Sequence, residues 1–218
     1  MVGDIDMLRA VERAPLRTMR LADAEQLNSN AWRALNVLCE AGALTRLAKG
    51  VYTAPPDGHD ARTWKPTLEA TGLALATARF GNRNAILMGL GAARHWAAIP
   101  RAIGDTTVAV PAAGRAPVTL DRGGTVHLIP RDLDRLEAVL ERTELGQGLV
   151  TTPAQTLFDL LRRPHQGGEP EAAAEAVRNL ATRVRATDFR RVMNKHPRGN
   201  DAVRGMLMKL EDQDAAAE

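Results

Sequence analysis

The chain has 218 residues, of which 44% are hydrophobic and 25% charged, and its formal net charge is +3. This composition fits a globular protein of one large or two small domains and excludes a disordered chain or a fibrous repeat, while so small a charge supports a nucleic-acid partner only weakly. The single cysteine, Cys39, excludes an internal disulfide and a cysteine-based zinc site.

The opening residues do not have the pattern expected of a secretory signal. The opening "MVGDIDMLRA" carries two aspartates and no long apolar run. No segment reaches the roughly 18 unbroken apolar residues of a membrane-spanning helix. We therefore expect a cytoplasmic protein with no membrane partner.

The first third of the chain predicts three short helices. The segment "DIDMLRAVERA" predicts the first helix, because Ile5, Leu8, Val11 and Ala14 lie at helical spacing. Acidic residues in the first turn of this helix favour it through the helix dipole. A second helix follows in "LADAEQL". In the third, within "NSNAWRALNVLCEAG", Asn28 or Ser29 is the expected cap and Gly42 ends the helix. Its apolar stripe comprises Ala31, Leu35 and Leu38.

A short hairpin follows the third helix. "ALTRL" and "GVYTA" flank a tight turn, at which Gly50 relieves the backbone. The next stretch, "APPDGHDARTWKP", is rich in Pro, Gly and Asp and is interpreted as a linker. We predict a winged helix-turn-helix over residues 1–56, a linker over 57–66, a C-terminal domain over 67–211 and a frayed acidic tail over 212–218.

The C-terminal domain is predicted to mix helices with a small sheet. "TLEATGLALATARF" indicates a helix, "NAILMGLGAARHWAAI" a strand running into a helix, and "DTTVAVP" and "GGTVHLIP" two strands. "LVTTPAQTLFDLLRR" predicts a helix capped by Thr152, with Pro153 in its first turn. Further helices are expected at about 170–182, 187–194 and 201–211. The expected fold class is α+β, with a C-terminal α/β domain.

A helix-turn-helix followed by a basic hairpin is typical of a winged helix, in which the third helix reads the major groove and the wing contacts the backbone. Arg and Asn pair bidentately with guanine and adenine, and basic wing residues hold phosphates. The predicted DNA-contacting residues are Asn30, Arg33, Asn36, Arg46, Lys49, Gly50 and Tyr52. Trp32 is expected to pack into the core of the domain. The alternative is a small helical domain that carries these charges for solubility.

The C-terminal helices carry a second concentration of charge. The segment from Arg178 to Lys209 contains nine basic residues and only two acidic ones. If they face one way, they form a basic surface for DNA or for an acidic partner protein; solvated helix faces are the third interpretation. The candidate residues are Arg178, Arg185, Arg190, Arg191 and Lys195.

No motif indicates catalysis. "MGLGAARHW" lacks the third glycine of a dinucleotide fingerprint, so Gly89 and Gly91 are interpreted as packing positions of a strand-to-helix turn. The histidines have no metal-ligand spacing, and neither GxSxG nor a Walker loop is present. Asp159, on a mostly apolar helix, is a candidate catalytic acid but is more commonly a capping or salt-bridged residue. We expect no catalytic residue, no metal and no cofactor.

The order of these segments resembles the AbiEi family of antitoxins, whose members pair with nucleotidyltransferase-like AbiEii toxins. The resemblance covers nearly the whole chain and rests on "AGALTRLAKGVYTAPP", "MGLGAARHW" and "LVTTPAQTLFDLLRR". Its most recognisable part is the wing, with Gly42, Leu44, Arg46, Gly50, Val51 and Tyr52; the second is the pattern from Thr152 to Leu160.

The resemblance implies an N-terminal winged helix that represses its own toxin-antitoxin operon at inverted repeats, and a C-terminal domain that neutralises the toxin. Members are usually described as acting without a stable toxin complex. The expected partners are therefore operator DNA and a nucleotidyltransferase-like toxin. The alternatives are an antitoxin that binds the toxin directly through its basic C-terminal helices, a general winged-helix transcriptional regulator, and a DNA-processing enzyme.

Overall fold

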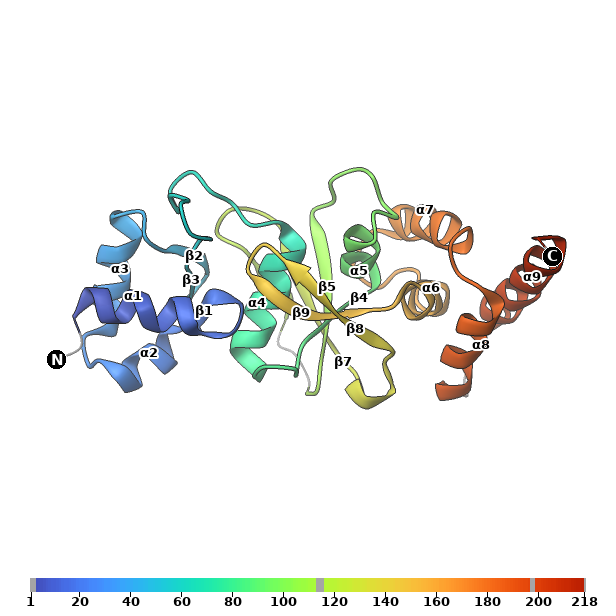
Figure 1. Ribbon diagram of the computed structural model, residues 1–218, viewed down its shortest axis with the longest axis horizontal. Helices are drawn as coiled ribbons and strands as arrows, with labels where there is room; N and C mark the ends of the chain where they lie inside the picture. The colour runs from blue at the N-terminus through green and yellow to red at the C-terminus, as the bar shows by residue number, and fades with distance from the viewer. Residues whose placement is uncertain (1–2, 113–115, 197–198, 218) are drawn as a thin grey trace.

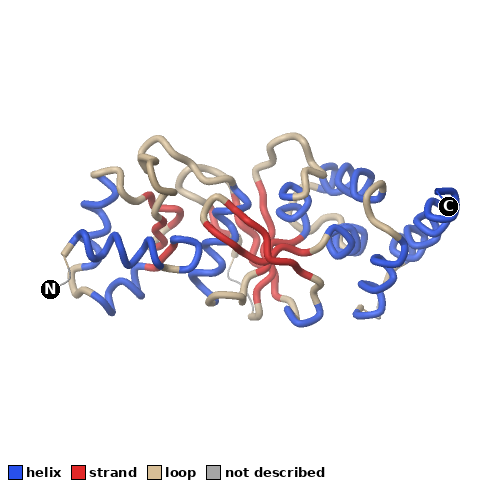
Figure 2. The backbone as a smooth tube through the Cα atoms, in the orientation of Figure 1, coloured by secondary structure: helices blue, strands red, loops and turns tan. Residues whose placement is uncertain are grey.

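The computed structural model describes residues 3–112, 116–196 and 199–217. The molecule is elongated, with the N-terminal helices at one end, a large sheet in the middle and the C-terminal helices at the other end (Figure 1). Strands are confined to two places, a small sheet beside the N-terminal helices and the large central one (Figure 2). The fold is α+β, as the sequence predicts.

The N-terminal unit has the topology of a winged helix-turn-helix. Its three strands form an antiparallel sheet in the order β1-β3-β2 over the described residues. Strand β1 is absent from the sequence-based prediction because three residues are too few for a period-2 pattern. The elements are α1 (Asp4–Arg13), the 3-10 turn η1 (Pro15–Arg17), β1 (Thr18–Arg20), α2 (Leu21–Leu27), α3 (Ala31–Glu40), β2 (Thr45–Ala48) and β3 (Val51–Thr53).

The small core of this unit confirms the stripe predicted for α3 and corrects three details. Met7, rather than Ile5, lies in the core beside Val11, and Ile5 is 68% exposed. Trp32 is 63% exposed and therefore does not pack into the core as expected. The N-cap of α3 is Asn30, without a side-chain cap bond, while Asn28 Oδ1 accepts the Asn30 amide at 2.9 Å just before the helix, so neither expected residue is the N-cap itself.

The large sheet has the strand order β6-β7-β5-β4-β9-β8 over the described residues, with β4/β9 and β5/β7 parallel and the other pairs antiparallel. The hairpin β8–β9 is missing from the prediction because its sequence alternates weakly. The elements are α4 (Leu68–Phe80), β4 (Ile86–Met88), α5 (Gly89–His95), β5 (Asp105–Val110), β6 (Val118–Thr119), β7 (Thr125–Pro130), the 3-10 turn η2 (Leu133–Arg135), β8 (Ala138–Thr143) and β9 (Gly146–Thr151).

The turn from β4 into α5 confirms the packing role of its glycines. A Cβ on Gly89, where φ is +52°, would lie 2.8 Å from Thr107 Oγ1. A Cβ on Gly91 would lie 2.5 Å from Thr106 Oγ1. Strand β5 therefore packs so closely on this turn that only glycine fits without a shift.

Four helices follow the sheet: α6 (Pro153–Arg162), α7 (Pro170–Ala181), α8 (Ala186–Lys195) and α9 (Asp201–Ala217). The predicted cap of α6 is confirmed, since Thr152 Oγ1 accepts a hydrogen bond from the Gln155 amide at 3.2 Å. Helix α9 continues to Ala217, so the acidic residues expected to be frayed are helical up to that point. None of the helices in the described part of the chain is long and apolar enough to cross a membrane.

The winged helix and the large sheet share one core. Leu16, in η1, has a left-handed φ of +51° and packs in a cluster with Leu73 of α4 and Val150 of β9. A non-glycine residue in this conformation is strained, and packing in this cluster offsets that cost. Gly148 leaves the necessary room, because a Cβ there would lie 2.4 Å from Leu73 Cδ2.

The hairpin β2–β3 contributes Leu47, Ala48 and Val51 to the same cluster. The segment interpreted as a linker also packs closely: Ala61 is fully buried and its amide donates to the Gly42 carbonyl at 2.9 Å. The wing is therefore held against the C-terminal part by shared packing.

Candidate nucleic-acid interface

Helix α3 turns one face to solvent. Burial of Ala31, Leu35 and Leu38 against the small core leaves the opposite side free. The residues of that side are Trp32, Arg33, Val37 and Glu40, which are exposed, and Asn36, which is half-buried. Since residues three and four apart share a helix face, Arg33, Asn36, Val37 and Glu40 form one continuous strip.

Arg33 and Asn30 meet the requirements for reading bases. Arg33 is exposed and makes no ion pair or side-chain hydrogen bond with any described residue. The exposed Asn30 makes no capping bond at the start of α3. Their donor groups therefore remain available to guanine or adenine edges in a major groove.

The wing turns at Lys49 and Gly50. Lys49 is exposed and has no ion-pair partner in the described ranges. Gly50 has φ +71°, and its carbonyl accepts a hydrogen bond from the Leu21 amide at 2.9 Å. The turn is thus fixed against the start of α2 and presents the Lys49 ammonium outward.

The other two wing residues differ from expectation. Arg46 forms an ion pair with Asp121, which follows β6 in the C-terminal part. Tyr52, expected on the wing surface, is only 2% exposed, because β3 is the middle strand of the small sheet and packs on the core of the winged helix. Tyr52 is therefore buried and not displayed on the outer surface of the wing.

A hollow of about 320 Å³ opens beside α3. Its lining comes from α3, the hairpin, the segment after β3 and the loop after β6, and includes Asn36, Cys39, Arg46, Tyr52, Arg62, Asp121 and Arg122. Burial raises the pKa of the Cys39 thiol and that of the Tyr52 phenol. Both groups are therefore neutral at physiological pH, and Cys39 lacks the thiolate character of a reactive cysteine.

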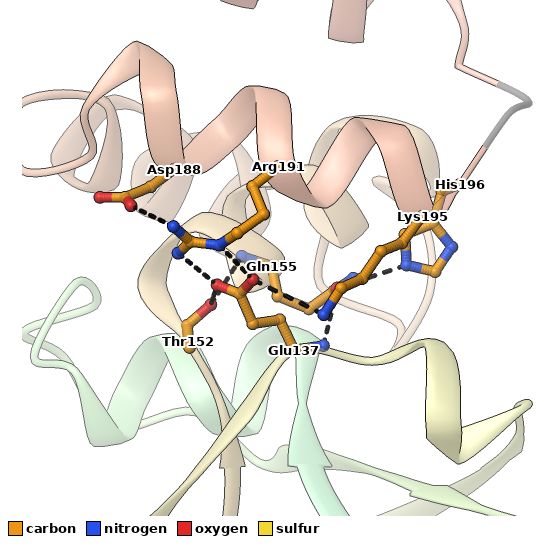
Figure 3. A network of polar contacts seen from close by, with 7 residues as sticks. All are labelled: Glu137, Thr152, Gln155, Asp188, Arg191, Lys195 and His196. Carbon is orange, nitrogen blue, oxygen red and sulfur yellow. Dashed lines mark hydrogen bonds and ion pairs between the residues drawn. The ribbon is translucent and has the colours of Figure 1, made fainter.

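Two of the five cations of the predicted basic C-terminal surface, Arg191 and Lys195, share the Glu137 carboxylate (Figure 3). Glu137 accepts hydrogen bonds from Arg191 at 2.8 and 3.0 Å and lies 3.8 Å from the Lys195 ammonium. Arg191 also pairs with Asp188 at 2.9 Å. The hydrogen bonds from Arg191 hold the pKa of the Glu137 carboxyl below its usual range.

Arg190 points elsewhere and pairs with Glu211 of α9. The five predicted cations therefore do not share one free face, which corrects the interpretation as a single basic surface. Arg178 and Arg185 alone of the five are exposed and without an ion pair among the described residues.

The network around Glu137 fastens α8 to α6 and the sheet (Figure 3). Thr152 Oγ1 donates to Glu137 at 3.2 Å, and the Glu137 amide donates to Gln155 Oε1 at 3.1 Å. His196 Nε2 lies 3.3 Å from the same Gln155 oxygen. The Thr152-to-Leu160 pattern thus serves structure. Sequence reasoning missed Glu137 because its cationic partners, Arg191 and Lys195, lie more than 50 positions away, at a separation of 54 for Arg191.

Asp159 lies on α6 and is held inside the protein. Its Oδ1 accepts from Gln155 Nε2 at 3.2 Å, and its buried Oδ2 has no hydrogen-bond partner in the described part of the chain. Burial raises the pKa of this carboxyl to about 7, against an opposing effect of Arg131. No group of three or more His, Cys, Asp or Glu among the described residues is placed to hold a metal ion.

No protein-family model matches the sequence, and no curated protein is significantly similar to it. Among solved structures, the Rv2827c protein from Mycobacterium tuberculosis superposes with a TM-score of 0.58 at 20% identity, covering 94% of this chain and 74% of that chain. An antigenic nucleotidyltransferase-like protein from Paracoccidioides brasiliensis gives a TM-score of 0.36 at 9% identity, over 57% of this chain and 84% of that one, a value too low to carry an argument. The chain therefore shares a related fold with the Rv2827c protein.

Proposed function

We propose that this chain is an autorepressing antitoxin, which binds the promoter of its own operon through the winged helix and neutralises a nucleotidyltransferase-like toxin encoded beside it. The free, exposed face of α3 is the observation that carries the DNA-binding half. The toxin half rests on the resemblance to the AbiEi antitoxins.

The face of α3 combines the two kinds of contact used in direct readout. Arg33 and Asn30 supply polar donors, and the exposed Val37 supplies an apolar contact suited to a thymine methyl group. Lys49 lies at the tip of the wing, where a lone ammonium suits a phosphate. Operator recognition by two copies on inverted repeats matches this arrangement.

Direct capture of the toxin by the basic C-terminal helices has less support. Arg190, Arg191 and Lys195 are already paired with carboxylates of the same chain. An acidic partner would have to displace those carboxylates, which removes most of the electrostatic gain. Neutralisation without a stable complex is the form of antitoxin action that we favour.

The DNA-binding half is tested with a duplex from directly upstream of the gene and a random duplex of equal length. We expect the upstream duplex to bind more tightly, and Arg33→Ala to reduce that preference. Arg178→Ala, an exposed and unpaired arginine on α7, is the matched control. Equal binding of the wild-type protein to both duplexes would rule out a sequence-specific repressor.

The toxin half is tested by co-expressing the chain with the adjacent nucleotidyltransferase-like gene. We expect growth to be rescued and the two proteins to purify separately. Co-elution would favour the direct-binding alternative, and failure to restore growth would contradict an antitoxin role.

A further inference from the structure

The hollow beside α3 is built by two segments outside the winged helix. The Ala61 amide donates to the Gly42 carbonyl at the end of α3, which brings Arg62 next to that helix. Gly42, with φ +76°, has room only for a hydrogen here, because a Cβ would lie 2.4 Å from Asp60 Oδ1 and 2.7 Å from Arg62 Nε.

The second segment is the loop after β6. The Asp121 amide donates to the Leu47 carbonyl of the wing at 2.9 Å. Arg122 donates to the carbonyls of Ala61 and Trp64, both at 2.7 Å. The loop, the wing and the segment after β3 are therefore fastened to one another around the hollow.

The lining of the hollow is cationic. Of its described lining residues, Arg46, Arg62 and Arg122 are basic and Asp121 is acidic. The internal partners of these arginines are limited: Arg46 pairs with Asp121, and Arg62 with Asp60 at 2.6 Å. The carboxylates of both pairs are partly exposed, at 30% for Asp121 and 40% for Asp60, so each can return to solvent when another anion takes its arginine, unlike Glu137 beside α8, which is 14% exposed.

A hydroxyl without a hydrogen-bond partner among the described residues also lines the hollow. Tyr52 is 2% exposed, and its hydroxyl makes no hydrogen bond with a described residue. It lies close enough to Arg46 and Asp121 for their charges to act on it. Because its proton is donated to no described residue, this hydroxyl is available to a bound oxyanion.

The ligand chemistry follows from the position of the hollow. Asn36, one helical turn after Arg33 on the same face of α3, also lines it. A helix that enters the major groove is flanked by backbone phosphates, so an anion site on this strip faces the DNA backbone.

We propose that the hollow takes a phosphate group of the DNA backbone, held by Arg46, Arg62 and the Tyr52 hydroxyl, with Asp121 as the internal anion that the phosphate displaces from Arg46. The inference rests on the proposed function, because it requires α3 to lie in a major groove. It makes the C-terminal part of the chain a participant in DNA binding.

Three variants test the site by equilibrium binding to the upstream and random duplexes. Arg62→Ala removes one cation, so it should weaken binding to both duplexes alike. Each lost phosphate contact flattens the slope of log affinity against log salt by about 0.9, so the loss should be about threefold larger at about 50 mM than at about 200 mM salt. Asp121→Asn should have the opposite effect: DNA should bind more tightly, and the slope of log affinity against log salt should become steeper.

Tyr52→Phe should weaken binding without changing the slope, because it removes a hydrogen bond and no charge. Asp60→Asn frees Arg62 and should also tighten DNA binding. It provides the same test if Asp121→Asn disturbs folding. Arg135→Ala is the matched control, since Arg135, like Arg62, is exposed and paired with a nearby aspartate, Asp132.

The outcomes separate this inference from the proposed function. If Arg33→Ala weakens operator binding while Arg62→Ala and Asp60→Asn behave like Arg135→Ala, the phosphate site is wrong and the repressor stands. If the wild-type protein binds neither duplex, both are wrong. Thermal stabilisation by inorganic phosphate that depends on Arg62, with unchanged DNA affinity, would assign the hollow to a free anion and overturn the proposal.

Discussion

Helices α3 and α8 both carry basic side chains at solvent-facing positions, and they differ in what those side chains contact. Arg33 on α3 has no ion-pair partner in the described ranges. On α8, Arg190, Arg191 and Lys195 all pair with carboxylates of the same chain. The sequence makes α8 the more basic helix, yet α3 has the freer cation.

The difference matters because phosphate binding depends on counterion release. A free arginine exchanges loosely held ions for a phosphate, and the released ions favour binding. An arginine paired with a largely buried carboxylate, such as Arg191 with Glu137 at 14% exposure, makes that exchange only at the cost of leaving the carboxylate unpaired. A count of basic residues therefore says less about DNA binding than their pairing does.

The largest loss of stability should come from the carboxylate that neutralises α8. The Glu137 side chain is 14% exposed, and Glu137→Gln leaves Arg191 and Lys195 without their shared anion. Because Glu137→Gln removes charge-assisted hydrogen bonds while Arg191 and Lys195 stay solvated at 55% and 43% exposure, we expect a loss of about 2 kcal/mol in the free energy of unfolding by denaturant titration. Asp132→Asn, in an exposed pair with Arg135, is the control and should cost less than about 1 kcal/mol. Equal losses in the two variants would mean that Glu137 does not fasten α8.

The difference between α3 and α8 is tested most directly by removing one arginine from each helix in separate variants. Arg33→Ala should reduce discrimination between operator and random DNA by roughly 1–3 kcal/mol, because a bidentate base contact is lost. Arg191→Ala should leave both affinities unchanged, since that guanidinium is bound to Glu137 and Asp188. Fluorescence anisotropy at fixed salt measures both. A loss of DNA affinity in Arg191→Ala would break the distinction between the two helices.

Asp159 should affect stability in a pH-dependent way and leave DNA binding alone. Its pKa of about 7 in the folded protein lies above the ordinary 3.8, so the folded state favours the protonated carboxyl. The stability that this provides is complete below pH 3.8 and is lost as pH rises through 7.

Asp159→Asn removes this titration. Its stability relative to wild type should therefore rise by about 2 kcal/mol between about pH 5.5 and about pH 8.5. Denaturant titrations at both pH values measure the change. His196, whose pKa burial lowers, titrates in both proteins and largely cancels in the difference. A pH-independent difference would show that Asp159 is ionised in the folded state, and metal-dependent nuclease activity lost in this variant would support the enzyme alternative.

Local patterns predicted much of the fold. The helix over Ala31–Glu40 follows from one apolar stripe, and α6 from the Thr152 cap and the proline after it, because these signals act within one or two turns. Local sequence patterns predict burial wrongly where segments distant in the sequence decide which side chains are covered. The sequence predicts Trp32 in the core and Tyr52 among the DNA-contacting residues, but Trp32 is 63% exposed and Tyr52 only 2% exposed.

The charged sites show the same limit more clearly. The sequence predicts Arg46 and Arg191 as DNA-contacting or surface cations, but Asp121 and Glu137 pair with them across separations of 75 and 54 residues. No pattern in the sequence near these arginines identifies Asp121 or Glu137 as their partners. Lys49 and Arg33 lie where the hairpin turn and the helix period place them, because exposure there depends only on the local element.

The smallest expected effect belongs to the wing tip. Lys49→Ala should weaken binding to operator and random DNA alike and flatten the salt slope by about one unit, since a phosphate contact carries no sequence information. Lys195→Ala is the matched control, because that ammonium lies beside Glu137 and should not alter the slope. Salt-dependent titrations on both duplexes measure the two variants. If Lys195→Ala flattened the slope as much as Lys49→Ala, the paired helix α8 would contact DNA after all, and pairing within the chain would no longer separate the two ends of the molecule.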